Sequence, residues 1–86
     1  MQIVFRRAAE RAFSRLPAGR RRQIISRIER LAGGSANLNL DIKPLAGGSG
    51  VFRLRVGDYR VLYSIDEAAD TLTIELIRGR GDVYKR

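Results

Sequence analysis

Arginines are the residues of this 86-residue sequence best suited to chemistry. Fifteen of the 17 basic residues are arginine, and with 9 acidic residues the formal net charge is +8. A guanidinium presents paired donors to phosphate or carboxylate oxygens, and it can stabilise negative charge that develops in a transfer reaction. The composition therefore predicts a partner rich in negative charge, either nucleic acid or an acidic protein.

An expected hairpin brings three of these arginines together. Residues 51–56 and 59–65 alternate apolar and polar side chains, and Gly57-Asp58 between them offers a two-residue turn. In that register Arg55 faces Arg60 on the face opposite the apolar side chains. The cluster consists of Arg53, Arg55 and Arg60. Opposed like charges destabilise a sheet, which favours an anion site, although long arginine side chains can also extend into water at little cost.

The C-terminal segment, residues 78–86, adds a tyrosine, a lysine and, besides the terminal Arg86, two arginines. These residues are Arg78, Arg80, Lys85 and Tyr84. Strict alternation along the last strand would place both arginines on the apolar face, so we expect the strand to end or to bulge near Gly79, which would let Arg80 join the cluster. Tyr84 is suited to stacking on an unpaired base, but it is also suited to packing over the sheet edge.

Two reactive residue types are absent, because the sequence contains no histidine and no cysteine. Their absence excludes a Cys-His pair, a histidine-based ribonuclease couple and the common zinc sites, and we expect no cofactor. Catalysis would depend on arginine, lysine, tyrosine and positioning. The lack of cysteine and of any long apolar segment predicts a cytoplasmic protein.

The elements that position these residues form one α+β domain, residues 1–86, because a chain of this length has room for one core. Periodicity predicts the order β-α-α-β-β-β. The expected elements are a strand at 2–5, a helix at 6–16, a second helix that ends with Ala32, and strands at 51–56, 59–65 and 72–76. Residues 33–50 are expected to form a loop with a short extended piece near 40–42. The helical hairpin should cover one face of an antiparallel sheet and leave the other face open.

Three segments together resemble the RelE toxins of the RelE/ParE superfamily. They are Lys43-Pro44-Leu45, the run FRLRVGDYRVLY at residues 52–63, and Arg80-Gly81-Asp82-Val83-Tyr84. The resemblance extends over essentially the whole chain. It implies the RelE-like fold and the toxin of a type II toxin-antitoxin system, which cleaves messenger RNA on the ribosome and pairs with an acidic RelB-like antitoxin. Operator DNA would be reached only through the complex with that antitoxin.

The resemblance also suggests residue roles. We expect catalytic roles for Arg55, Arg60, Arg80 and Tyr84, and RNA-binding roles for Arg53, Lys43, Arg78 and Lys85. In the family, the ribose 2′-hydroxyl attacks the adjacent phosphate and leaves a 2′,3′-cyclic phosphate. Arg55 stands where RelE has a lysine proposed as general base, and Arg78-Gly79-Arg80 lacks the histidine of the Gly-His-Arg found in many relatives. A guanidinium stays protonated, so proton removal is left without an assigned residue.

Two other functions are compatible with the same fold. One is a ParE-like toxin that inhibits DNA gyrase without chemistry, and the other is a non-catalytic relative that binds RNA or its antitoxin. Arg60, Arg80 and Tyr84 together favour the ribonuclease. Residues 1–32 carry nine arginines against two glutamates, for a charge of +7. This segment has two interpretations, a surface for ribosomal RNA or a docking face for an acidic antitoxin helix.

Overall fold

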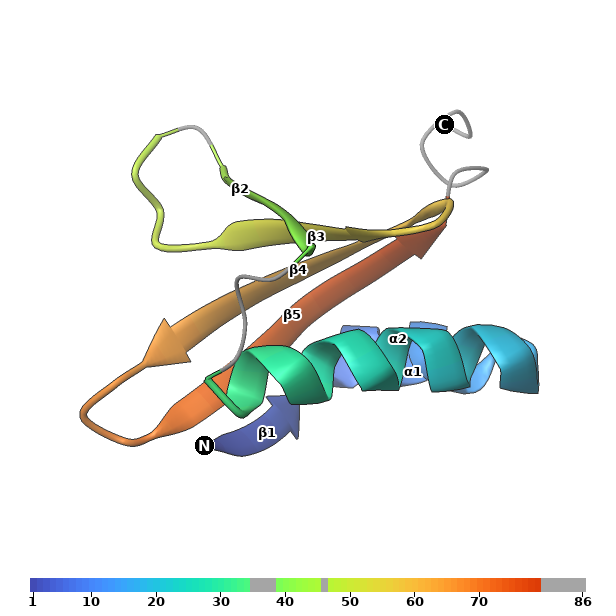
Figure 1. Cartoon of the computed structure of the whole chain (residues 1–86), viewed down its shortest axis with the longest axis horizontal. Helices are drawn as coiled ribbons and strands as arrows, with labels where there is room; N and C mark the ends of the chain where they lie inside the picture. The colour runs from blue at the N-terminus through green and yellow to red at the C-terminus, as the bar shows by residue number, and fades with distance from the viewer. Residues whose placement is uncertain (35–38, 46, 80–86) are drawn as a thin grey trace.

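The computed structural model describes residues 1–34, 39–45 and 47–79. Seven elements follow one another in this part of the chain (Figure 1). They are β1 (Gln2–Phe5), α1 (Arg7–Ser14), α2 (Ala18–Ala32), β2 (Asp41–Pro44), β3 (Phe52–Val56), β4 (Tyr59–Asp66) and β5 (Thr71–Gly79). The predicted order is confirmed with one addition, because β2, which overlaps the short extended piece expected near residues 40–42, is a strand of the sheet.

The five strands form a single sheet in the order β1-β5-β4-β3-β2. Strands β2 to β5 pair antiparallel with their neighbours, whereas β1 pairs parallel with β5. The sheet is therefore mixed, where the sequence predicted an antiparallel one. Only strands joined by tight turns must run antiparallel, and the chain leaves β1 through two helices before it enters the rest of the sheet.

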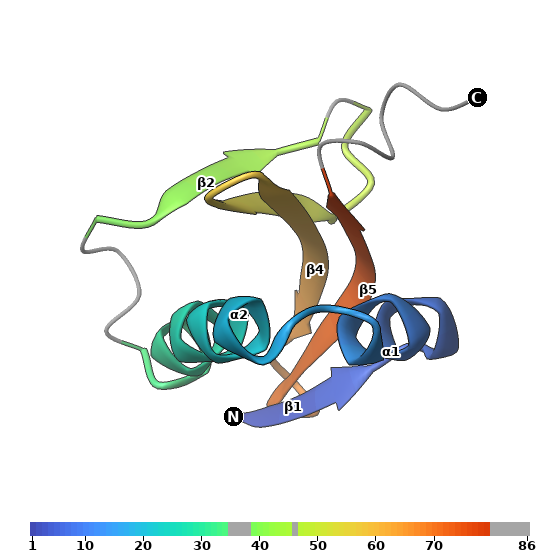
Figure 2. The same cartoon turned by 90° about the vertical axis from the view of Figure 1, so that its right-hand side faces the viewer.

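Both helices lie against the same face of the twisted sheet (Figure 2). Helix α2 buries Ile24, Ile28 and Leu31, which recur at the spacing of one helical face. Helix α1 buries Ala9, and its Phe13 ring packs against Phe5 of β1 with 5.3 Å between centroids. The sheet contributes the other buried side chains of the core. These are Leu54, Val56, Val61, Tyr63, Leu72, Ile74 and Ile77.

The joint between the helices is held by an arginine. The Nη1 atom of Arg21 donates a hydrogen bond of 2.5 Å to the carbonyl oxygen of Leu16, in the connection that follows α1. The last carbonyls of a helix have no partner within the helix, so this bond satisfies a backbone group that the turn at Pro17 leaves exposed. One arginine of the basic N-terminal segment therefore has a structural role.

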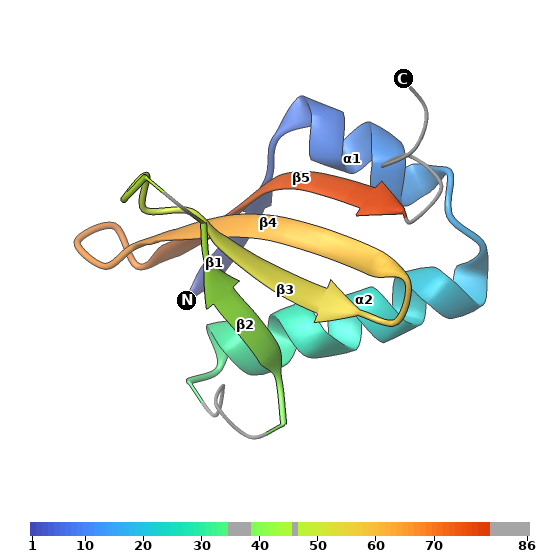
Figure 3. The ribbon, with the colours of Figure 1, turned by 90° about the horizontal axis from the view of Figure 1, so that it is seen from above.

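The face of the sheet opposite the helices is called the open face below. Seen from above, β2 to β5 extend over both helices and present this face to the viewer (Figure 3). Within the described ranges, no helix is long and apolar enough to cross a membrane.

Candidate functional site

The β3–β4 hairpin positions Arg55 and Arg60. Its turn begins at Gly57, whose φ of 59° suits the two-residue turn that accepts glycine at its first central position. The observed register places Arg55 opposite Arg60, Leu54 opposite Val61, and every other pair of the two strands as predicted. Burial sorts the two faces accordingly, since Leu54 and Val61 are buried and the two arginines are exposed.

A β-bulge in β5 brings a third arginine to the open face. Leu62 pairs with Leu76 while Tyr63 pairs with Ile74, so Glu75 is an extra residue in β5. This insertion reverses the alternation of the strand beyond it. The sequence predicted that the strand ends or bulges near Gly79; the bulge itself lies four residues before that position.

The consequence of the bulge is seen at the end of β5. Ile74 and Ile77 are both buried although they are three positions apart along the strand, an odd spacing that regular alternation would place on opposite faces. Arg78 consequently lies opposite Arg60 and is exposed. Strict alternation would have turned Arg78 toward the helices, where a buried guanidinium would need a partner.

The three residues Arg55, Arg60 and Arg78 form what we call the arginine row, since they occupy opposed positions on β3, β4 and β5. Neighbouring strands lie about 4.8 Å apart, so the row spans about 10 Å at the backbone. Across the described residues, none of the three guanidinium groups donates a hydrogen bond or forms an ion pair. The row is therefore a line of exposed cations available to an anion.

The row continues onto β2 with a carboxylate. Asp41 lies opposite Arg55, but its Oδ1 atom accepts a hydrogen bond of 2.8 Å from Nη2 of Arg53, one step diagonally across the strands. The side chain of Asp41 is 51% exposed, whereas that of Arg53 is 16% exposed. Because Oδ1 of Asp41 pairs with Arg53, Arg55 forms no ion pair within the described residues although it lies opposite Asp41.

Arg53 and Lys43, two of the expected RNA-binding residues, occupy opposed positions next to the row. The Nε atom of Arg53 is buried and has no hydrogen-bond partner within the described part of the chain. Arg53 is thus held by the protein to a greater degree than the arginines of the row, while Lys43 is exposed. Their RNA-binding roles remain predictions.

A second carboxylate of the open face, that of Glu75, accepts a hydrogen bond on each of its two oxygens. Glu75, in the bulge, accepts a hydrogen bond of 2.5 Å from Nε of Arg6 on one oxygen and a hydrogen bond of 2.7 Å from Oγ of Ser64 on the other. Its side chain is 23% exposed. This network ties the bulge to the segment that enters α1 and fixes the strand that carries Arg78.

On the face toward the helices, the hairpin that carries Arg55 and Arg60 is packed by an aromatic pair. The rings of Phe52 and Tyr63, which face each other across β3 and β4, stack with centroids 5.7 Å apart and an interplanar angle of 24°. Burial raises the pKa of the Tyr63 phenol, because the phenolate would lose its hydration. The hydroxyl therefore stays neutral in the folded protein at physiological pH.

Three of the expected site residues, Arg80, Tyr84 and Lys85, lie outside the described residues. Asp41 is a residue of the site that the sequence reasoning missed. The signal was present, since Asp41 and Lys43 alternate with Leu40 and Ile42 at the period of a strand. The many glycines around this short stretch are typical of a loop, so no strand of the sheet was predicted there.

Comparison with known proteins shows the family to which this chain belongs. The family model described as the ParE toxin of the type II toxin-antitoxin system parDE matches residues 3–84. The chain belongs to this toxin family. The resemblance to the RelE/ParE superfamily that the sequence predicted is therefore confirmed. A search of curated proteins gave no match.

Solved structures agree with this assignment. The RelB-RelE antitoxin-toxin complex from Methanococcus jannaschii contains a chain that is 28% identical, with 94% of each chain covered and a TM-score of 0.76. The RelBE2 complex from Mycobacterium tuberculosis gives 30% identity, 94% and 92% coverage and a TM-score of 0.63. The YoeB/ParE toxin from Agrobacterium tumefaciens shares the fold, with a TM-score of 0.78 over 92% and 98% of the two chains at 18% identity.

Proposed function

We propose that this toxin is a ribosome-dependent endoribonuclease that cleaves messenger RNA and so inhibits translation. The observation that supports the proposal is the arginine row, three exposed guanidinium groups in line on an open sheet face with no acidic partner among the described residues. Placing like charges at opposed positions costs stability, so their presence favours a bound polyanion.

The chemistry follows from the charge of the row. When the 2′-hydroxyl of a nucleotide attacks the adjacent phosphate, negative charge builds up on the oxygens around phosphorus, and fixed guanidinium groups stabilise it. Arg55 and Arg60, opposed on the hairpin, would grip the reacting phosphate, and Arg78 would contact the neighbouring one. By family position Arg80 and Tyr84 join them, and the ribosome would supply the orientation of the message.

The proposed partners follow from the same family. The relatives from M. jannaschii and M. tuberculosis were solved as complexes of RelE with RelB antitoxins. A net charge of +8 fits an acidic antitoxin that covers the arginines and neutralises the toxin. Operator DNA would be bound only through that complex, and the site of action would be the cytoplasm, where ribosomes are.

The decisive experiment is primer extension on messenger RNA in a purified translation system, with wild type and Arg60→Ala, with and without ribosomes. We expect cuts at defined codon positions that need ribosomes and that fall about 100-fold or more in Arg60→Ala, because a group that stabilises the developing charge is lost.

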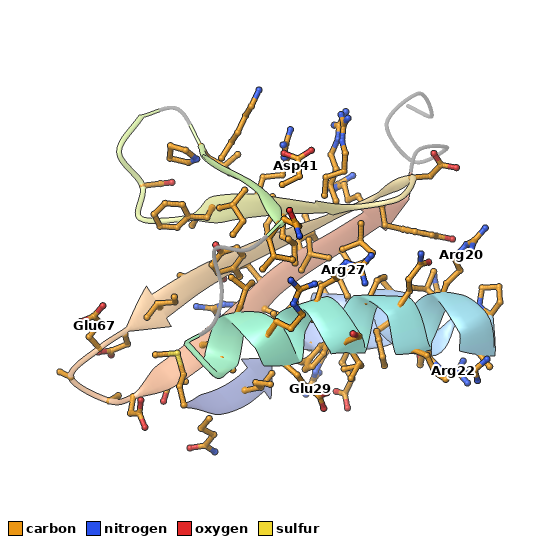
Figure 4. All side chains as sticks on the ribbon, in the orientation of Figure 1. Arg20, Arg22, Arg27, Glu29, Asp41 and Glu67 are labelled. Atoms are coloured by element: carbon orange, nitrogen blue, oxygen red, sulfur yellow. The ribbon has the colours of Figure 1, made fainter. Side chains whose placement is uncertain are left out.

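Arg22→Ala is the matched control, since it also removes one exposed arginine but lies on α2, on the helix side of the sheet (Figure 4). Both variants are compared at saturating ribosome concentration, where a change in ribosome affinity alone does not lower the cleavage rate. If cleavage depended only on total charge, the two variants would lose activity equally, and the proposed role of the row would be wrong. Message left intact by the wild type, with ribosomes present, would refute the ribonuclease.

A ParE-like inhibitor of DNA gyrase is the second candidate, because the matching family model is that of the ParE toxin. A supercoiling assay with purified gyrase tests it directly. Inhibition of supercoiling together with intact message would establish this alternative. Inactivity in both assays, with retained binding to RNA or antitoxin, would point to a non-catalytic relative.

A further inference from the structure

Attack by a 2′-hydroxyl requires an acceptor for its proton, and the arginine row cannot supply one. Guanidinium groups stay protonated and act only as donors. The protein contains no histidine or cysteine, and the ordinary pKa values of lysine and tyrosine are about 10, so the side chains that are ordinarily unprotonated at neutral pH are carboxylates. The best candidate is a carboxylate of the open face that lies beside the row and has one oxygen without a hydrogen bond.

Glu75 and Asp41 are the carboxylates found on the strands of this face close to the arginines. Glu75 uses both of its oxygens, one for Nε of Arg6 and one for Oγ of Ser64. Asp41 uses only Oδ1, for Nη2 of Arg53, and its Oδ2 has no hydrogen bond in the described part of the chain. Asp41 is also half exposed, so substrate can reach it.

The position of Asp41 suits a base. It is the β2 residue directly opposite Arg55, and side chains at opposed positions have Cβ atoms about 5 Å apart. A phosphate gripped by Arg55 and Arg60 would therefore place the adjoining ribose next to Asp41. Figure 4 shows Asp41 on the side of the sheet away from α2, the side on which the row lies.

The hydrogen bond from Arg53 gives Asp41 a fixed orientation. Arg53 is itself largely buried, so it is a rigid anchor for Oδ1 and leaves Oδ2 directed away from that bond. A base is effective when its acceptor atom is already positioned before substrate binds. The other charged side chains around Asp41 are Lys43, two residues along β2, and Arg55.

We propose that Asp41 is the general base of the reaction, an inference that rests on the proposed ribonuclease function. Oδ2 of Asp41 takes the proton of the 2′-hydroxyl, and the 2′-oxygen forms a bond to phosphorus. The bond from phosphorus to the 5′-oxygen of the next nucleotide breaks with its electron pair, and that oxygen takes a proton from water. The products are a 2′,3′-cyclic phosphate and a 5′-hydroxyl.

The test measures single-turnover cleavage of message on programmed ribosomes by wild type, Asp41→Asn and Asp41→Glu. Asparagine keeps the shape and can still accept the hydrogen bond from Arg53, but it cannot take the proton. We expect Asp41→Asn to cleave about 100- to 10,000-fold more slowly while its affinity for ribosomes stays within a few-fold, as loss of a general base requires. Asp41→Glu should restore part of the rate.

The dependence of the rate on pH separates a base from a residue that merely holds Arg53. Asp41→Asn must rely on hydroxide, so its rate should rise with pH between about pH 6 and pH 9 more steeply than the wild-type rate, by about tenfold per pH unit. Arg53→Gln removes the same ion pair from the other side. It should keep the pH profile of the wild type, whatever its rate.

Glu67→Gln provides the control for loss of one negative charge, since Glu67 lies in the turn between β4 and β5, far from Asp41 (Figure 4). We expect wild-type cleavage from it. Wild-type rates in Asp41→Asn, or a pH profile in that variant no steeper than that of the wild type, would overturn the role of Asp41 and leave the ribonuclease intact. A wild-type protein that leaves message uncut would overturn both proposals together.

Discussion

At the scale of single residues, the site contains arginines that are unpaired within the described ranges and, next to them, arginines that each form an ion pair. Arg55, Arg60 and Arg78 form no ion pair within the described ranges, while Arg53 and Arg6 are each bound to a carboxylate. Exposed ion pairs add little to stability, so the paired arginines are explained by positioning of the site more than by folding energy. The unpaired ones are the residues that carry the proposed RNA contact.

Tyr63 gives a prediction at this scale. Its phenol has a raised pKa in the folded protein because of burial, so the folded state keeps a proton that the unfolded chain releases. The contribution to stability is complete below the ordinary phenol pKa of about 10 and is lost as pH rises above that value. Chemical denaturation between pH 8 and pH 11 should show a smaller alkaline loss of stability in Tyr63→Phe. An unchanged slope would contradict the assignment to Tyr63.

At the scale of elements, the hairpin and the bulge set the arginine row. The turn at Gly57 fixes which residues of β3 and β4 face each other, and a slip of one strand by one residue would turn its arginine toward the helices. The bulge at Glu75 performs the same task for β5. The turn and the bulge therefore each determine which face of the sheet an arginine occupies.

Two glycine substitutions test this dependence on backbone conformation. Gly57 has a φ of 59°, so Gly57→Ala should lower the free energy of unfolding by about 1–3 kcal/mol although no atom obstructs its methyl group. Gly19, in the first turn of α2, also has open space, and Gly19→Ala should raise stability by about 0.5–1 kcal/mol because alanine favours the helix. Urea denaturation measures both. Equal effects of the two substitutions would mean that the turn does not require glycine.

At the scale of the whole molecule, positive charge lies on both layers. The arginine row covers the open face, and the helices carry exposed arginines that include Arg7, Arg11 and Arg22. In the described part of the chain, four large apolar side chains are exposed, and none of them lies on a helix. They are Met1, Val4, Leu45 and Ile65. The exposed side chains of the helical layer are therefore mainly charged, which suits a polyanionic ligand, either RNA or an acidic antitoxin.

Salt dependence tests this distribution of charge. Binding of the toxin to ribosomes should weaken steeply as salt rises, because each phosphate contact releases counterions. For a single-stranded RNA, replacing the three arginines of the row by alanine should reduce the slope of log K against log salt by about 2, or about 0.7 for each contact.

The control for that measurement is a triple variant on the helices, with alanine at Arg7, Arg11 and Arg22. If the helices contact ribosomal RNA, this variant should also lower the slope for ribosomes. If they instead hold an acidic antitoxin, the ribosome slope would stay as in the wild type and the antitoxin affinity would fall. A flat salt response of the wild-type protein would exclude phosphate contacts on both faces.

The sequence by itself determined the local structure and the family. Alternation at 51–65 with Gly57-Asp58 between its two runs predicted the hairpin register correctly, because side-chain direction in a strand has a period of two and a two-residue turn fixes the pairing. The break between the helices at Pro17 and the end of α2 before Gly33 also followed from local chemistry, although α1 ends at Ser14, two residues before the predicted end. The resemblance to RelE was likewise read from local motifs.

Tertiary structure decided what depends on contacts distant in the chain. The parallel pairing of β1 with β5, the place of β2 at the sheet edge and the bulge at Glu75 are set by neighbours many residues away, which no local period encodes. Asp41 reaches the arginine row only because β2 pairs with β3. Arg78 faces the open side because burying Ile74 and Ile77 together forces the strand to bulge, and apolar burial outweighs regular pairing.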